Sequence, residues 1–254
     1  MAWNPTQYLR YGDERMRPAL DLLAAIPAEA PRTVVDLGCG PGNVTVLLQR
    51  RWQEAEITGV DASPEMLERA AQAAPACVFM LAEIATWQPE TPPDVIYSSA
   101  ALHWLGEHES LFPRLLGQLA PGGTLAVQMP AMHGAPLRRL QDEVAASGPW
   151  AAALAGVHSA PPILAAEAYW DLLRPRCRTL DIWETTYLHV LKGEDAVGEW
   201  AAGTSLRPFL DPLTPELRAG YRRAYAAALA PHYPPRPDGT TLLPFRRLFI
   251  LARR

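Results

Sequence analysis

The sequence predicts an α/β fold in which a mostly parallel sheet carries helices on both faces. Three observations lead to this class: apolar runs alternate with helical patterns between residues 33 and 129, a glycine-rich turn directly follows the first apolar run, and long β-like runs occupy residues 179–191 and 242–252. Strands that alternate with helices are joined by right-handed crossovers, which make the strands parallel. The first half of the chain is therefore expected to form one layered sheet.

The expected elements follow a regular order through this first half. A helix begins near Asp13, a good N-cap residue, and its apolar positions Leu20, Leu23 and Ala24 keep helical spacing. Pro64 suits the first turn of a later helix, where its missing N–H costs nothing. We expect strands at residues 33–37, 57–60, 77–81, 94–98 and 124–129, and helices at 44–52, 64–73 and 107–119.

The second half of the chain differs. Residues 135–173 are helix-rich and interrupted by prolines, and residues 195–230 are again helical. No internal repeat or low-complexity linker divides the chain, so we expect a single domain over residues 1–254. Its core would comprise about 30–130, 178–192 and 240–254, and helical cap insertions would comprise about 131–177 and 193–239. Lids and specificity loops are usually built from such additions.

The amino-acid composition favours a globular protein over a membrane-spanning or nucleic-acid-binding one. With 49% hydrophobic and 20% charged residues, the chain is ordinary for a globular protein. No apolar run reaches the roughly 20 residues that a membrane span needs, and the N-terminus lacks a signal-peptide pattern, so we expect a cytoplasmic protein. A net charge of −4 without a long basic run predicts no nucleic-acid partner. The scattered cysteines and histidines predict no metal site, and a monomer acting on a small molecule is the default expectation.

The most informative feature is the run Val-Val-Asp-Leu-Gly-Cys-Gly-Pro-Gly at residues 34–42. It places Asp36 at a strand end and Gly38, Gly40 and Gly42 in the turn, and Asp61 follows at the tip of the next apolar run. This order of strand, glycine turn, helix, strand and acid is typical of proteins that bind a nucleotide-type ligand across parallel strands.

The spacing of the glycines argues against a phosphate ligand. Gly42 falls one residue early for the dinucleotide pattern, and no Lys-Ser or Lys-Thr follows to make a P-loop. Asp36 points an anion at the turn, which disfavours phosphate and favours a cationic ligand. A sulfonium with an amino-acid tail is such a ligand.

The pattern D-x-G-x-G-x-G resembles motif I of the class I S-adenosylmethionine-dependent methyltransferases. The resemblance implies S-adenosylmethionine as cofactor, held by Asp36 and the three glycines, with Asp61 accepting hydrogen bonds from the ribose. It also implies the Rossmann-like class I methyltransferase fold, a mostly parallel seven-stranded sheet with a C-terminal antiparallel hairpin and helical cap insertions.

Three further segments extend the resemblance to that family. The run at residues 61–66 is similar to its post-I motif, in which Ala62 and Met66 lie beside the cofactor, although Met66 also suits plain helix packing. Glu83 and Ile84 stand where the family has an acid that accepts from the adenine amino group, and Glu83 is one methylene longer than the usual aspartate. Ser98, at the end of the fourth strand, completes the expected cofactor contacts.

The segment that follows Ser98 is expected to face the methyl acceptor. It contains neither the Asn/Asp-Pro-Pro-Tyr/Phe signature of amide and base methylation nor a Pro-Cys pair, which leaves an oxygen or carbon acceptor on a small molecule. His103 is the one titratable side chain nearby. The sequence leaves open whether His103 is a catalytic base or a structural hydrogen-bonding residue.

A closer resemblance covers almost the whole chain. The N-terminal Trp3-Asn4-Pro5 block and several later ones are similar to the trans-aconitate methyltransferases, which esterify one carboxylate of a tricarboxylic acid; these blocks include residues 102–105, 127–130, 155–158, 181–183, 206–208 and 247–250. A carboxylate is already ionised at neutral pH, so its attack on a methyl group needs no general base. Departures from the family pattern at residues 98–104 and 131–132 leave a related polycarboxylic acid open as the acceptor.

The carboxylates that are not methylated need cationic partners, and arginine binds them best because it offers two parallel N–H groups. Arg207, between Leu206 and Pro208, is the first choice for this catalytic role. The other candidates within the resembling blocks are Arg15, Arg17, Arg246 and Arg247, with Tyr8, Tyr11, His103 and Gln128 as neutral helpers. Two alternatives stay open: a hydroxyl or phenol O-methyltransferase with His103 as its base, and a cofactor-binding protein without catalysis.

Overall fold

The computed structural model describes the backbone of residues 12–254 and the side chains from residue 16 onward. These residues fall into two compact units. The sheet unit comprises residues 15–130, 163–185 and 247–254, and the helical unit comprises residues 131–162 and 186–246 together with 12–14.

A seven-stranded sheet runs through the chain in the order β3-β2-β1-β4-β5-β7-β6. Its strands are β1 (Thr33–Leu37), β2 (Glu56–Asp61), β3 (Val78–Leu81), β4 (Val95–Ser99), β5 (Thr124–Pro130), β6 (Thr179–Lys192) and β7 (Thr240–Arg253). The pairs among β1 to β5 are parallel, whereas β7 runs antiparallel to β5 with Arg247 opposite Pro130. This order confirms the expected Rossmann-like fold with its late strands added at the β5 edge.

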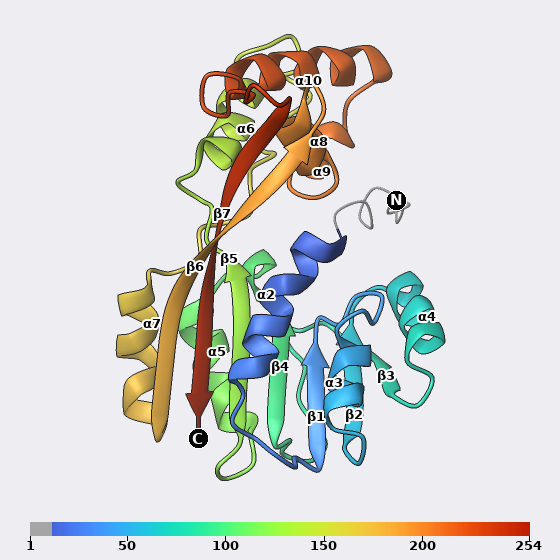
Figure 1. The fold of residues 1–254 in the computed structure, drawn as a ribbon, viewed down its shortest axis with the longest axis vertical. Helices are drawn as coiled ribbons and strands as arrows, with labels where there is room; N and C mark the ends of the chain where they lie inside the picture. Colours follow the sequence, from blue (N-terminus) through green and yellow to red (C-terminus); the bar gives the residue numbers. More distant parts are fainter. Residues whose placement is uncertain (1–11) are drawn as a thin grey trace. The chain divides into compact units, whose positions relative to one another are not determined.

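Helices cover both faces of the sheet unit (Figure 1). The Tyr97 hydroxyl of β4 donates to the Ala19 carbonyl 2.9 Å away and fixes α2 to one face. Ser63 caps α4, since its hydroxyl accepts from the Met66 N–H, and Pro64 occupies the first turn as predicted. The helices of this unit are α2 (Gly12–Ala25), α3 (Thr45–Arg51), α4 (Pro64–Ala73), η1 (Leu102–Trp104), α5 (His108–Gln118), α7 (Ala166–Leu173) and η2 (Arg174–Arg176).

The boundaries between the units differ from the expected core and cap segments. Residues 163–177 were expected in the cap, but α7 belongs to the sheet unit because Tyr169 is fully buried against α5, hydrogen-bonded to His108 and 4.8 Å from the Phe112 ring. In the opposite sense, residues 186–192 and 240–246 group with the helical unit, since side chains such as Leu243 join its hydrophobic cluster.

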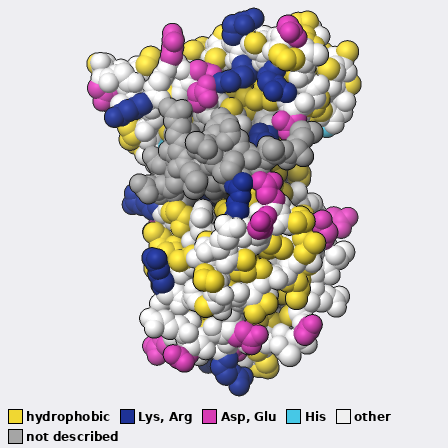
Figure 2. Space-filling model, turned by 90° about the vertical axis from the view of Figure 1, so that its right-hand side faces the viewer, with side chains coloured by type: hydrophobic (Ala, Val, Ile, Leu, Met, Phe, Trp, Pro, Cys, Tyr) yellow, Lys and Arg dark blue, Asp and Glu magenta, His cyan; other side chains and the backbone are white. Residues whose placement is uncertain are grey.

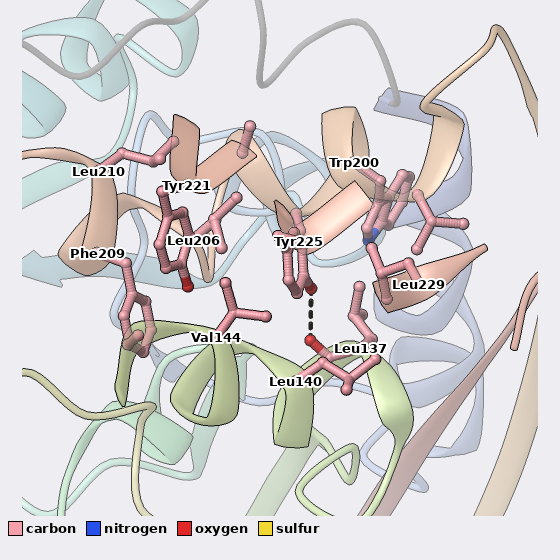
Figure 3. Close-up of a cluster of buried hydrophobic side chains, with 14 of the residues drawn as sticks. Leu137, Leu140, Val144, Trp200, Leu206, Phe209, Leu210, Tyr221, Tyr225 and Leu229 are labelled. Atoms are coloured by element: carbon pink, nitrogen blue, oxygen red, sulfur yellow. Dashed lines mark hydrogen bonds between the residues drawn. The ribbon is translucent and has the colours of Figure 1, made fainter. Parts of the chain in front are cut away.

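The helical unit packs four helices around its own core: α6 (Pro136–Ala146), α8 (Ala196–Ala202), α9 (Arg207–Leu210) and α10 (Pro215–Leu229). The helical stretch expected at 195–230 is broken into three helices, and Pro208 and Pro215 each lie in the first turn of a new one. Figure 3 shows the aromatic side chains of this core, where the Tyr225 hydroxyl donates to the Leu137 carbonyl at 2.6 Å. A buried polar group of this kind is stabilising only when it is paired.

The described surface shows no continuous stripe of one charge on the face seen in Figure 2, where basic and acidic side chains are interspersed. Within residues 12–254, no helix is both long and apolar enough to cross a membrane. The same part of the chain brings no three His, Cys, Asp or Glu side chains together as a metal site.

Candidate functional site

The glycine turn after β1 has a conformation that requires glycine. Gly38, Gly40 and Gly42 have φ angles of 81°, 53° and 82°, in the left-handed region that side chains disfavour. A Cβ on Gly38 would lie 2.2 Å from the Ala101 Cβ, whereas one on Gly40 would meet no atom of the described residues within 4 Å. The first glycine thus allows close packing against the chain after β4, and the middle one has space beside it among the described residues.

Asp61, at the tip of β2, is fixed beside this turn. One carboxylate oxygen accepts from the Gly40 N–H and the other from the Ser63 N–H, each at 2.9 Å. Two backbone hydrogen bonds, from the N–H groups of Gly38 and Cys39 to the Val60 carbonyl, hold the turn against the same strand. An ionised carboxylate can accept about four hydrogen bonds, so Asp61 has capacity left for hydroxyl donors.

Asp36 is a buried carboxylate at the end of β1, with 1% of its surface exposed. Its partner is the Thr45 hydroxyl of α3, which donates at 2.6 Å. Burial raises the pKa of Asp36 to about 7, the Thr45 hydrogen bond lowers it, and the nearby Asp61 raises it. A cation at the turn would favour the ionised form of this group.

The expected adenine-side residues lie on two short segments of the sheet unit. Ala62 and Glu83 are exposed, and Met66 is half-buried in the first turn of α4. The Ile84 side chain lies beside the turn, 3.2 Å from the position of a Cβ on Gly38. Trp87 is buried and fills the core.

Arg114 of α5 holds the segment that carries Glu83 and Ile84. Its guanidinium donates to the carbonyls of Ile84, Ala85 and Trp87 at 3.0, 2.9 and 2.6 Å. Three hydrogen bonds from one side chain restrict this loop, whose own backbone lies outside any strand or helix.

The end of β4 combines a strained backbone with buried polar groups. Ser98 is fully buried and its hydroxyl donates to the Leu37 carbonyl at 2.7 Å, so it ties β4 to β1, a different contact from the expected one with a cofactor. Ala100 has a φ of 54°, uncommon for a residue with a side chain, and such strain is often found at functional sites. The His103 ring in η1 is buried and lies 4.6 Å from the exposed Trp104 ring.

Gln128 and Arg247 form a buried polar chain with Ser99. The Gln128 amide on β5 donates to the Ser99 hydroxyl at 2.7 Å, and its oxygen accepts from the Arg247 guanidinium at 3.0 Å. Both side chains are almost completely buried, with 1% of Gln128 and 4% of Arg247 exposed. Gln128 was expected to contact the substrate, and here it contacts two other polar side chains.

The remaining expected substrate residues lie elsewhere in the chain. In the helical unit, Arg207 is 4.0 Å from Asp211, the C-cap residue of α9, and Arg246 donates to the Ala131 carbonyl at 3.1 Å. Tyr8 and Tyr11 lie outside the described residues, as does the side chain of Arg15. The sheet unit brings together the turn glycines, Asp36, Asp61, Ala62, Met66, Glu83 and Ile84.

Comparison with known proteins shows the family of the chain. Residues 34–123 match the family described as "Methyltransferase domain". The trans-aconitate 2-methyltransferase of Methylobacterium radiotolerans is 52% identical over 99% of this chain and 98% of its own length, and that of Azoarcus sp. is 48% identical over 99% of both. The chain belongs to the trans-aconitate 2-methyltransferase family.

Solved structures with lower identity share the fold of this family member. The YcgJ protein from Bacillus subtilis has a TM-score of 0.63 at 14% identity and covers 94% of this chain and 98% of its own. Phosphoethanolamine N-methyltransferase 2 from Haemonchus contortus, solved with S-adenosyl-L-methionine, has a TM-score of 0.56 at 13% identity and covers 93% of this chain and 52% of its own. These likenesses extend over nearly all of the chain.

Three residues of this trans-aconitate 2-methyltransferase family member gain a place at the candidate site only from the structure. Thr45 donates a hydrogen bond to Asp36, and Arg114 holds the loop that carries Glu83. Ser99 accepts a hydrogen bond from Gln128, which in turn contacts Arg247. Arg247 was already one of the five candidate arginines, among which Arg207 was the first choice. Ser99 could have been found from its place at the strand end, whereas Arg114 has no signal in the sequence.

Proposed function

We propose that the protein transfers the methyl group of S-adenosylmethionine to a carboxylate of trans-aconitate. The observation that carries this proposal is the similarity, over 99% of the chain, to relatives named for this reaction. The substrate is therefore a small polycarboxylic acid.

The residues around the glycine turn suit the cofactor. Among the described residues, the space beside Gly40 leaves room for a ligand against the backbone, and the Asp36 carboxylate suits a positively charged group. Asp61 has acceptor capacity for ribose hydroxyls, and the exposed Glu83 can accept from an adenine amino group. When bound, S-adenosylmethionine supplies an electrophilic methyl group on a positively charged sulfur.

The chemistry requires orientation more than acid–base catalysis. The attacking carboxylate is ionised at neutral pH, so the protein need not remove a proton from it. Its residues must instead hold the carboxylate in line with the methyl carbon and keep water away. Orientation of this kind contributes up to about 7–11 kcal/mol in well-aligned model reactions.

A panel of carboxylic acids tests the proposal. Purified protein is incubated with labelled S-adenosylmethionine and a set of di- and tricarboxylic acids, and the products are identified by mass spectrometry. We expect a monomethyl ester of trans-aconitate at the highest kcat/KM. The absence of any ester above background across the panel would contradict the proposal.

His103 distinguishes carboxylate from hydroxyl methylation. If the acceptor were a hydroxyl group with His103 as base, His103→Ala would lose orders of magnitude in kcat and the rate would rise through a pKa near 6–7. With a carboxylate acceptor we expect the variant to lose less than about tenfold and the rate to show no such dependence on His103.

A further inference from the structure

We propose that Arg247 binds a substrate carboxylate other than the one that is methylated, and that Gln128 is the positioning residue for its guanidinium. The inference rests on the proposed function, because it assigns the polycarboxylate specificity to particular residues. Both residues lie in the sheet unit, so their contacts are defined within one compact part of the molecule.

The strand register places this pair where an acceptor is expected. Gln128 lies opposite Ser99 of β4 and opposite Phe249 of β7, and Arg247 is two residues from Phe249. Because side chains alternate along a strand, Arg247, Gln128 and Ser99 share one face of the sheet. Their hydrogen bonds cross three neighbouring strands at the carboxyl ends of β4 and β5, the edge at which ligands bind in open α/β sheets.

The same face carries the candidate cofactor carboxylate. Tyr97 is two residues before Ser99 on β4 and lies opposite Asp36 on β1. Asp36 and Arg247 therefore project from the same face, an anion from β1 and a cation from β7. A negative charge at one end of the site suits a cationic methyl donor, and a positive charge at the other end suits an anionic acceptor.

The hydrogen-bond chain sets the orientation of the guanidinium. The donation from the Gln128 amide to Ser99 turns the amide oxygen toward Arg247, where it accepts one N–H. A guanidinium has five N–H donors, and a carboxylate takes two of them in parallel. Gln128 is a neutral partner, so its hydrogen bond orients the Arg247 guanidinium and does not itself neutralise its charge.

The other candidate arginines have different contacts. The Arg207 guanidinium lies near the acidic Asp211 on its own helix, and Arg246 donates to a main-chain carbonyl. Arg247 combines almost complete burial with a side-chain partner that orients it. A charge-assisted hydrogen bond is stronger where water is excluded, so a buried guanidinium discriminates well between acids.

The decisive experiment compares substrates as well as variants. Wild-type protein, Arg247→Lys, Arg247→Met and Gln128→Glu are assayed with trans-aconitate and with dicarboxylic acids that each lack one of its carboxyl groups. We expect Arg247→Met to raise KM for trans-aconitate about 10- to 100-fold, as the loss of a charge-assisted pair implies. The preference of the wild type for trans-aconitate over one dicarboxylic acid should fall to about one in this variant.

Gln128→Glu tests the positioning role. The new carboxylate would pair with Arg247 and compete with the substrate, so KM should rise while kcat changes little. Arg253→Met is the matched control on the same strand, since Arg253 lies at its other end opposite Thr124 and bonds the Gly122 carbonyl. Binding of S-adenosylhomocysteine by calorimetry and the melting temperature report whether each variant is folded.

The outcomes separate this inference from the proposed function. If wild-type protein forms no ester from any acid, the proposed function fails and the inference fails with it. If wild-type protein methylates trans-aconitate but the folded Arg247 variants keep its KM and its preference, only the inference is overturned. If Arg247→Met does not fold, the same readouts on Arg247→Lys and Gln128→Glu decide, and an unchanged KM in both overturns it.

Discussion

The Thr45 hydroxyl donates a 2.6 Å hydrogen bond to the Asp36 carboxylate, which joins the first turn of α3 to the end of β1 across the glycine turn. The carboxylate is 1% exposed, and its pKa is raised to about 7 mainly by burial. A group that titrates near neutral pH makes cofactor binding sensitive to pH in the physiological range.

The affinity for S-adenosylmethionine should increase with pH because of Asp36. A folded-state pKa of about 7, above the ordinary 3.8, means that the protein without ligand holds a proton on Asp36 below about pH 7. The stability contributed by this group therefore falls as pH rises from about 4 to 7. A cationic ligand prefers the ionised form. Calorimetry should therefore give a Kd about tenfold higher at pH 6 than at pH 8. An equally steep dependence in Asp36→Asn would contradict this origin.

Thr45 should set the midpoint of that dependence. Its hydrogen bond lowers the pKa of Asp36, so Thr45→Val should raise the pKa further and move the midpoint of binding to higher pH. Thr45→Ser keeps the hydroxyl and serves as the matched control. The Kd for S-adenosylmethionine is measured from pH 5.5 to 9 for both variants, and coincident midpoints would refute the role of Thr45.

The close contact between Gly38 and Ala101 can be tested by a double substitution. Gly38→Ala should destabilise the protein by about 2 kcal/mol or more, because its Cβ would lie 2.2 Å from that of Ala101 and its φ is 81°. Ala101→Gly should restore part of this loss in the double variant. Urea unfolding measures both, and strictly additive effects would argue against the contact.

Gly40 provides the comparison within the same turn. A Cβ there would enter open space, so we expect Gly40→Ala to cost about 1 kcal/mol of stability, from its φ of 53° alone. The new methyl group would nevertheless occupy the space assigned to the cofactor. Binding of S-adenosylhomocysteine should weaken more in Gly40→Ala than the stability loss implies, and unchanged binding would place the cofactor elsewhere.

Arg114 should affect the cofactor through the loop that carries Glu83. Arg114→Met removes three hydrogen bonds to that loop and should weaken binding of S-adenosylhomocysteine about tenfold. KM for the carboxylic acid should stay nearly unchanged, which separates a loop effect from general damage. Arg139→Met, on the exposed side of α6, is the control, and an equal loss in both variants would contradict the assignment.

Most of the fold follows from patterns that are local in the chain. The alternation of apolar runs and helical spacing predicted the parallel strands, and Pro64 and the glycines marked turns, because each depends on residues close in sequence. Segment 163–177 groups with the sheet unit because Tyr169 is buried against α5, about 60 residues away in the sequence. Contacts of that range leave no periodic signal.

The amino-acid sequence by itself determined the sheet, the conformation required at the glycine turn and the positions of the acids at the ends of β1 and β2. These features depend on backbone sterics and on the order of apolar runs, both of which can be read from neighbouring residues. Only the tertiary structure decided which polar groups meet. It placed Gln128 between Ser99 and Arg247, residues 29 and 119 positions away from it. Hydrogen bonds and burial depend on which residues are close in space. Arg247 could therefore be selected as the arginine proposed to bind a substrate carboxylate only once β7 was seen to pair with β5.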